Sequence, residues 1–364
     1  MDIYDEILKS LETEDQVMLA TIIATTGSTP ASGHSKMLIR QHGIVSAGTV
    51  GGGCMEGDVI TSANKLFDAG VADILTFQLN NDDVEHGLIC GGSLDVLIEP
   101  IKRRDMPMLR SLKTLRDAGK DSLLLSLLEP DKTIALKFVV DNNTSIPEIQ
   151  KKIGVIPFDL QDVVQKTLHR QETRRIRFDD RELIIEPVAG SPSLIIFGGG
   201  HVSKYVCRFA SAIGFRVMII DDRPSFANRQ RFPDAVETIA EDFASVFDRI
   251  SITASSYIVI VTRGHRYDEE VLERAIRTDA RYIGMIGSKK KVLTTFEHIL
   301  DRGGSADALR RVYAPIGIDV GAVTAEEIAL SIVAELTKIR RDAASPLCYK
   351  SEAIKDLASQ IQKP

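Results

Sequence analysis

The feature that most constrains the fold is residues 194–222, "LIIFGGGHVSKYVCRFASAIGFRVMIIDD". The order predicts an apolar strand, a glycine-rich turn, a helix, a second apolar strand and an acidic pair. Gly198 permits a tight turn, Gly200 lets the backbone approach a pyrophosphate at the helix N-terminus, and Ser203 supplies a further small residue. This combination predicts a Rossmann-like domain.

Asp221 lies at the end of the second strand, where an acidic side chain can accept hydrogen bonds from ribose hydroxyls. The pair Asp221 and Asp222 would repel a 2′-phosphate, so a bound dinucleotide would be NAD rather than NADP. The alternative is a Rossmann scaffold whose glycines only make turns, because a fold does not determine a function.

Beyond this stretch the chain alternates strands with helices, which predicts a doubly wound parallel sheet. Arg263, His265 and Asp268 follow one strand and would lie at its carboxyl edge, where ligands bind. Ser288 follows the next strand and would cap a helix that begins with Lys289 and two more lysines. Lysines oppose the helix dipole there, so either an anion offsets them or the turn is simply solvated.

The N-terminal part predicts a mixture of helices and hairpins, an α+β domain. The helices are expected at 3–11, 55–70 and near 104–118, the strands at 17–26, 72–79 and 94–101, the hairpins at 36–49, 122–140 and 174–188, and a linker at 189–193.

The segment "GTVGGGCMEGDV", residues 48–59, places Cys54 just before the predicted helix at 55–70. Free N–H groups and the helix dipole favour a thiolate there. The backbone of Gly51, Gly52 and Gly53 could wrap a phosphate or pterin edge, and Glu56 follows two residues after the cysteine. The pattern leaves open whether Cys54 is a packing residue, a metal ligand, a nucleophile or a cofactor ligand.

Cys90, in "GLICGGSLDV", is also flanked by glycines, and with Cys54 it suggests a common site for a soft ligand. His34 and His86 either complete a metal site or are ordinary loop residues. Cys207 falls inside a helix and is expected in the core.

Composition and the lack of targeting segments indicate the cellular compartment and exclude some classes of partner. Four scattered cysteines suit a reducing cytoplasm. The formal net charge of −6 argues against nucleic acid or an anionic membrane as the main partner. The N-terminus lacks a signal peptide, and no apolar run approaches the roughly 20 residues of a membrane span. We therefore expect a cytoplasmic protein.

Eight motifs together resemble the XdhC/CoxI family of accessory proteins of xanthine dehydrogenase and related molybdenum hydroxylases. They are "TTGSTPASGHSKMLI", "GTVGGGCMEGDV", "GLICGGSLDVLIEP", "FGGGHVS", "DDRPSFANRQRFPDA", "RGHRYDEEVL", "YIGMIGSKKK" and "PIGIDVGAVTAEEIALSIVAEL". The resemblance covers the first hundred residues and almost all of 193–340. It implies an N-terminal α+β domain with a middle extension (1–188), a Rossmann-like domain (193–345) and a tail (346–364).

The resemblance further implies a protein that binds and protects molybdenum cofactor and helps load its sulfurated form into an apo-enzyme of xanthine dehydrogenase type. Cys54 is then the leading candidate for contact with molybdenum or its terminal sulfur, and no catalytic residue is expected. A cysteine desulfurase and a second copy of the chain stay open as partners. The candidate cofactor-binding residues are Cys54, Gly51, Gly52, Gly53, Glu56, Cys90, Gly198, Gly200, His201, Asp221, Ser288 and Lys289.

Two other functions compete with this one. An NAD-dependent oxidoreductase would use His265 as acid or base, with Cys54 or Cys90 near the substrate. A nucleotide-using transferase that modifies the cofactor would bind phosphates at "GSKKK". The sequence lacks the G-x-x-x-x-G-K-[ST] phosphate loop, which argues against an ATPase.

Overall fold

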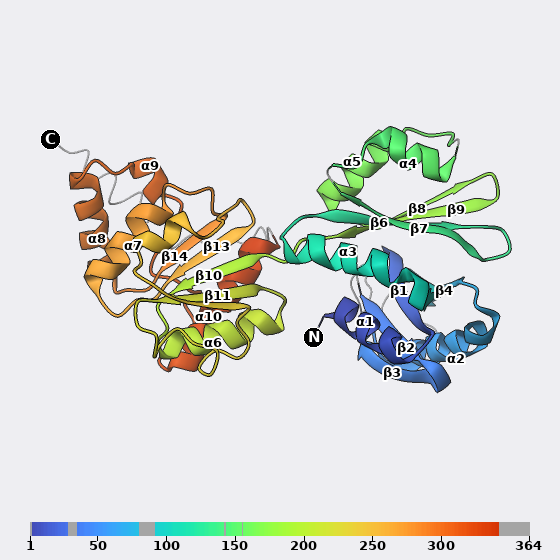
Figure 1. Cartoon of the computed structure of the whole chain (residues 1–364), viewed down its shortest axis with the longest axis horizontal. Coiled ribbons are helices and arrows are strands. Elements are labelled where there is room, and N and C mark those ends of the chain that lie inside the picture. The colour runs from blue at the N-terminus through green and yellow to red at the C-terminus, as the bar shows by residue number, and fades with distance from the viewer. Residues whose placement is uncertain (1, 28–34, 80–91, 142, 155, 342–364) are drawn as a thin grey trace. The chain divides into compact units, whose positions relative to one another are not determined.

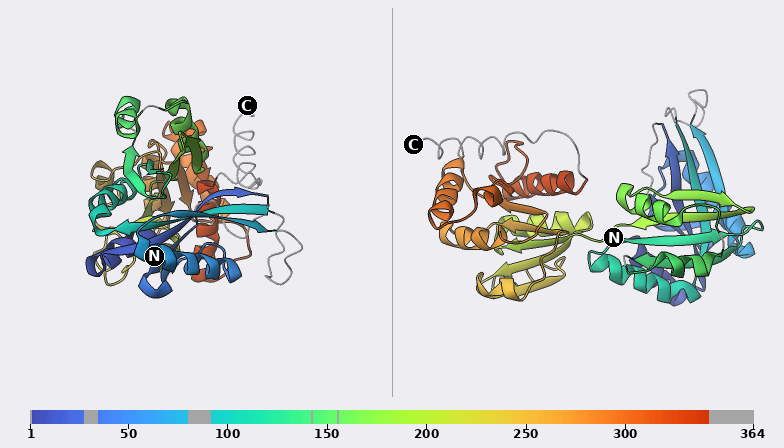
Figure 2. Two further views of the ribbon diagram at one scale, coloured as in Figure 1. Left: turned by 90° about the vertical axis from the view of Figure 1, so that its right-hand side faces the viewer. Right: turned by 90° about the horizontal axis from the view of Figure 1, so that it is seen from above.

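A computed structural model of the chain describes residues 2–27, 35–79, 92–141, 143–154 and 156–341. The chain divides into two compact units, Met1–Gly190 and Ser191–Pro364, both drawn in Figures 1 and 2. The predicted tail, 346–364, lies outside the described residues. None of the helices in the described part of the chain is long and apolar enough to cross a membrane.

The first unit contains two antiparallel sheets, which confirms the α+β prediction. The strand orders are β3-β2-β1-β5-β4 and β7-β6-β9-β8. The strands are β1 (Gln16–Thr26), β2 (Lys36–Arg40), β3 (Ile44–Gly48), β4 (Asp73–Leu79), β5 (Gly92–Lys102), β6 (Ser122–Leu128), β7 (Ile134–Asp141), β8 (Arg174–Phe178) and β9 (Arg181–Val188).

Both faces of the five-stranded sheet are covered. Met18 and Ile22 of β1 pack with Val59 of α2, whereas Ile23 packs with Ile184 of the second sheet. Side chains of β1 that point to opposite faces of the sheet therefore pack into two different hydrophobic cores. The helices of this unit are α1 (Ile3–Thr13), α2 (Gly53–Ala69), α3 (Met106–Asp117), α4 (Ile146–Ile153) and α5 (Leu160–Arg170).

Helices α4 and α5 were not predicted from the sequence. They cover the far face of the four-stranded sheet (Figure 1), where Ile149 and Val164 pack against Leu125 and Leu183. Both are short amphipathic helices, and Ser145 and Glu148 form a capping box at the start of α4.

The second unit is a six-stranded parallel sheet of order β12-β11-β10-β13-β14-β15, which confirms the Rossmann-like prediction. The two short edge strands, β12 and β15, were not predicted. Its elements are β10 (Ser193–Phe197), α6 (His201–Ala212), β11 (Arg216–Asp221), β12 (Glu237–Ala240), β13 (Ser256–Ile260), α7 (His265–Ala275), β14 (Tyr282–Met285), α8 (Lys289–Asp301), α9 (Ala306–Leu309), β15 (Val312–Tyr313) and α10 (Ala325–Arg340).

Alternate residues of the central strands pack on opposite faces of this sheet. Ile195 and Phe197 face the core under α7 and α8, and Leu194 and Ile196 face the core under α6 and α10. The strand order reverses at β10, because β11 lies on one side of it and β13 on the other. The turns after β10 and β13 therefore flank the crevice where open sheets of this kind bind ligands.

Candidate functional site

The first candidate site is the glycine loop that connects β3 to α2. Its three glycines all adopt positive φ angles: 128° at Gly51, 81° at Gly52 and 65° at Gly53. A Cβ at Gly52 or Gly53 would meet no atom within 4 Å. The backbone conformation therefore requires glycine, and the space beside these two residues is open to an incoming group.

Cys54 is exposed and lies in the first turn of α2. The helix begins at Gly53, two residues earlier than predicted, because Gly52 serves as the N-cap through its backbone alone. The thiol therefore lies within the turn whose N–H groups lack helical partners, rather than before it. This placement leaves an accessible sulfur at a helix N-terminus.

Glu56 organises the loop from within. Its Oε1 accepts hydrogen bonds from the Thr49 hydroxyl and from the N–H groups of Val50 (3.0 Å) and Gly52 (3.1 Å). The Thr49 hydroxyl oxygen in turn accepts from Gly51 N–H (3.1 Å). Partial burial by itself would raise the pKa of Glu56, yet these hydrogen bonds outweigh it and lower the pKa below its ordinary value.

Of the other cysteines and histidines that the sequence analysis considered with Cys54, only Cys207 lies among the described residues. Cys90, His34 and His86 lie outside the described residues. Cys207 is buried in α6, as predicted, and burial raises the pKa of its thiol to about 12. Within the described ranges, no group of three His, Cys, Asp or Glu side chains is arranged to hold a metal ion.

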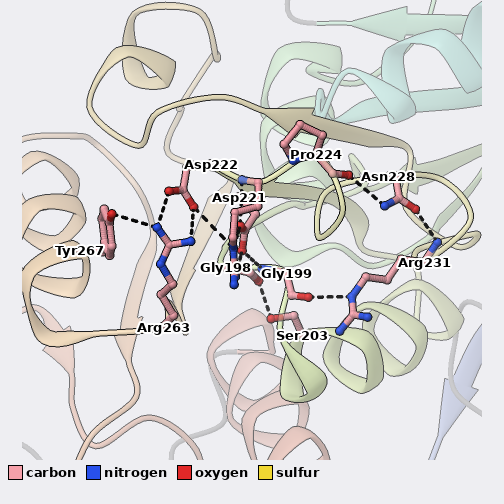
Figure 3. Close-up of polar contacts among 11 residues, drawn as sticks. Gly198, Gly199, Ser203, Asp221, Asp222, Pro224, Asn228, Arg231, Arg263 and Tyr267 are labelled. Atoms are coloured by element: carbon pink, nitrogen blue, oxygen red, sulfur yellow. Dashed lines mark hydrogen bonds and ion pairs between the residues drawn. The ribbon is translucent and has the colours of Figure 1, made fainter.

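The second candidate site is the glycine turn after β10 (Figure 3). Gly198 has a φ of 107°, and its N–H donates to Ile220 O at 2.7 Å. Ser203 Oγ donates back to Gly198 O at 2.5 Å. Gly200 is the N-cap of α6, and a Cβ there would meet no atom within 4 Å. His201 is the first residue of α6 and is exposed.

Asp221 is engaged within the protein. Its Oδ2 accepts from Gly199 N–H (2.8 Å) and Arg223 Nη2 (3.0 Å), and its Oδ1 accepts from Arg223 N (3.1 Å) and Nε (2.8 Å). Burial would raise the pKa of this carboxyl, but these hydrogen bonds lower it. With the residue only 1% exposed, its oxygens are not available to ribose hydroxyls. The contacts therefore do not support NAD as a ligand.

The segment after β11 packs over this turn. A Cβ on Gly199 would lie 2.3 Å from Phe226 O, and Arg231 Nε donates to Gly199 O at 2.8 Å. Asn228 Oδ1 accepts from Arg231 N at 2.9 Å, and the Arg223 guanidinium lies 3.5 Å from the centre of the Phe226 ring. Figure 3 shows Asn228 and Arg231 beside Gly199. Sequence reasoning missed both arginines as parts of the site, although the motif "DDRPSFANRQRFPDA" contains them.

The turn after β13 completes the carboxyl edge. Arg263 makes two hydrogen bonds to Asp222, at 3.0 and 2.6 Å, and one to Tyr267 at 2.9 Å. Asp222 therefore pairs with an arginine from the opposite side of the crevice. His265 is exposed at the start of α7.

Ser288 caps α8 as predicted, since its side chain accepts from Lys291 N at 3.2 Å. Lys291 Nζ forms an ion pair with Asp268, which is fully buried. The charge of one of the three lysines is therefore balanced by a carboxylate of the protein itself. Lys289 and Lys290 are exposed. Ser288 and Lys289 follow β14 and share the carboxyl edge of the sheet with the glycine turn; Cys54 belongs to the other unit.

Comparisons with known proteins match both units. The model of the XdhC Rossmann domain matches residues 194–336, and the model of the XdhC and CoxI family matches residues 10–78. A protein of Bacillus subtilis named as a probable xanthine dehydrogenase subunit is 26% identical over 92% of this chain and 96% of its own length.

Two further relatives extend the comparison. A molybdenum cofactor insertion chaperone of Escherichia coli, PaoD, is 20% identical over 89% of this chain and 83% of its own length. A crystal structure described as a xanthine dehydrogenase from Bacillus halodurans superposes with a TM-score of 0.75, at 25% identity, over 96% of this chain and 99% of that one.

Proposed function

The chain belongs to the XdhC and CoxI family, and on this premise we propose that it is an accessory protein that binds molybdenum cofactor and assists its insertion into a molybdenum hydroxylase. The observation that carries the proposal is the exposed Cys54 thiol beside the open backbone of Gly52 and Gly53. A relative of similar length is named an insertion chaperone for this cofactor.

The residues of the Cys54 loop fit one end of the cofactor better than the other. Molybdenum cofactor, when bound, would supply a metal–sulfur centre and a phosphate. A thiolate is a soft ligand suited to the metal–sulfur centre. The N–H groups of Val50 and Gly52 already donate to Glu56, so they do not offer a phosphate site. We therefore propose that Cys54 contacts the metal–sulfur end.

The two rival functions lack a specific observation in their favour. The oxidoreductase needs a dinucleotide, and the carboxylate expected to bind its ribose is held by Gly199 and Arg223. The transferase needs the lysines after Ser288 for phosphates; Lys291 pairs with Asp268, which leaves only the exposed Lys289 and Lys290 for that role.

The test is purification of the full chain from a host that makes molybdenum cofactor, followed by assay of released pterin. We expect wild type and Cys207→Ala to retain pterin and Cys54→Ala and Cys54→Ser to lose most of it. The serine variant keeps the shape of the side chain and removes only the soft ligand. Equal pterin in all four proteins contradicts the assignment of Cys54, and absence of pterin from wild type contradicts the proposed function.

We further propose that the sulfurated form of the cofactor is the form delivered, which adds a cysteine desulfurase to the partners. Gel filtration of the cofactor-loaded protein with a desulfurase and with a xanthine dehydrogenase-type apo-enzyme tests both associations. Light scattering in the same runs tests whether the protein is a homodimer. Elution of each protein at its own position argues against the partner concerned.

A further inference from the structure

Glu56 follows Cys54 by two residues, yet its side chain is directed at the loop that precedes the helix. Three donors converge on a single oxygen, Oε1: the Thr49 hydroxyl, Val50 N–H and Gly52 N–H. Successive backbone N–H groups of a glycine-rich turn form the kind of concavity that binds anions. In this loop the anion is a side chain of the protein itself.

A glutamate carboxylate is ionised at neutral pH, and all three hydrogen bonds run from an N–H or O–H donor to its oxygen. Hydrogen bonds to a charged acceptor are stronger than those between neutral groups. They hold a loop with three consecutive glycines, the residue type that loses the most conformational freedom on folding. Cys54 is attached directly to this loop, so its position depends on the same bonds.

We infer that Glu56 is a positioning residue, which takes the place of an external anion in the glycine loop and thereby holds Cys54 in place for a soft ligand. The statement about the ligand rests on the proposed function; the statement about the loop does not. The ligand class that follows is a metal–sulfur group that approaches Cys54 over Gly52 and Gly53. A phosphate of the same ligand is bound elsewhere.

The test compares Glu56→Ala and Glu56→Gln with Asp58→Asn in the full chain. Asp58 is exposed on the same helix, so its variant makes a matched change of charge without touching the loop. N-ethylmaleimide, a neutral reagent, alkylates Cys54, and mass spectrometry of the peptide that contains Cys54 gives its rate. Each protein is measured with and without acetate at constant ionic strength.

We expect wild type and Asp58→Asn to react at rates that do not depend on acetate. Glu56→Ala should react faster by about tenfold, because the loop that restrains Cys54 then loses its hydrogen bonds to a charged group, and the loss of one such bond changes the population of open loop conformations by about this factor. Acetate should return its rate toward that of wild type, because it can occupy the vacated place beside the loop N–H groups. Glu56→Gln should react at an intermediate rate, independent of acetate, because its amide still fills that place.

A Glu56→Ala protein that reacts at the wild-type rate, or whose faster rate ignores acetate, overturns the inference. If circular dichroism shows that Glu56→Ala does not fold, Glu56→Gln decides: a rate above that of Asp58→Asn supports the inference, and an equal rate overturns it. Released pterin separates the two proposals. If the acetate response is seen but wild type carries no pterin, the proposed function is contradicted and the positioning role of Glu56 in the loop stands. If Glu56→Ala carries as much pterin as wild type, Glu56 is not needed to position Cys54 for the ligand.

Discussion

Replacing Asp221 with asparagine tests whether this carboxylate supports the glycine turn. Asparagine keeps one acceptor oxygen, which can still serve the two donors now bonded to Oδ1. Its amide NH₂ would then face Gly199 N–H and Arg223 Nη2, the donors now bonded to Oδ2. A buried N–H left without an acceptor costs about 1–3 kcal/mol. The lost ion pair adds about 1 kcal/mol, a discounted figure because the Arg223 side chain is 32% exposed.

The free energy of unfolding of Asp221→Asn should therefore be about 2–4 kcal/mol lower than that of wild type. For a dependence of this free energy on urea of about 2 kcal/mol/M, the urea midpoint falls by about 1–2 M. The chain has seven tyrosines and no tryptophan, and every tyrosine except Tyr4 lies in the second unit. Tyrosine fluorescence thus reports mainly on this unit. Asp222→Asn is the matched control, since the Asp222–Arg263 pair is more exposed and its loss should lower the free energy of unfolding much less.

The pH dependence provides an independent check. The folded pKa of Asp221 lies below its ordinary value of 3.8, so its stabilisation is complete above that value and is lost as the pH falls through the folded pKa. The difference between wild type and Asp221→Asn should hold from pH 7 to pH 5 and shrink below pH 3.8. Equal midpoints for the Asp221 and Asp222 variants, or a difference that grows on acidification, would refute the reasoning.

Two further predictions concern thiols and glycines. In the native protein Ellman's reagent should modify Cys54 quickly and Cys207 only after urea is added, since the first is exposed and the second is buried with a raised pKa; equal rates in native protein would contradict the placement. Gly199→Ala should lower the free energy of unfolding by at least about 1–3 kcal/mol, because its Cβ would lie 2.3 Å from Phe226 O. Gly200→Ala should lower it much less, because the space beside Gly200 is open. Urea titrations of both variants compare them directly, and equal midpoints would contradict the packing described.

Much of the fold could be predicted because it is encoded locally. The strand–turn–helix–strand order of 194–222 depends on apolar periodicity and on small residues at a turn, which neighbours in sequence supply. The short strands β12 and β15, of four and two residues, are too brief to show such a period. They exist because β11 and β14 offer hydrogen-bonding edges to them, and that requires the assembled sheet.

The sequence by itself determined where the glycine turns lie and that a helix begins beside Cys54. Only the tertiary structure decided what the N–H groups of those turns bind. In both units the partner is a carboxylate of the chain, Glu56 for Gly52 and Asp221 for Gly199, where sequence reasoning expected a ligand. The reason is physical: an N–H group that folding removes partly or fully from water takes whichever acceptor the folded chain brings within reach. Asp221 reaches Gly199 from the next strand of the sheet, a proximity that local periodicity does not encode.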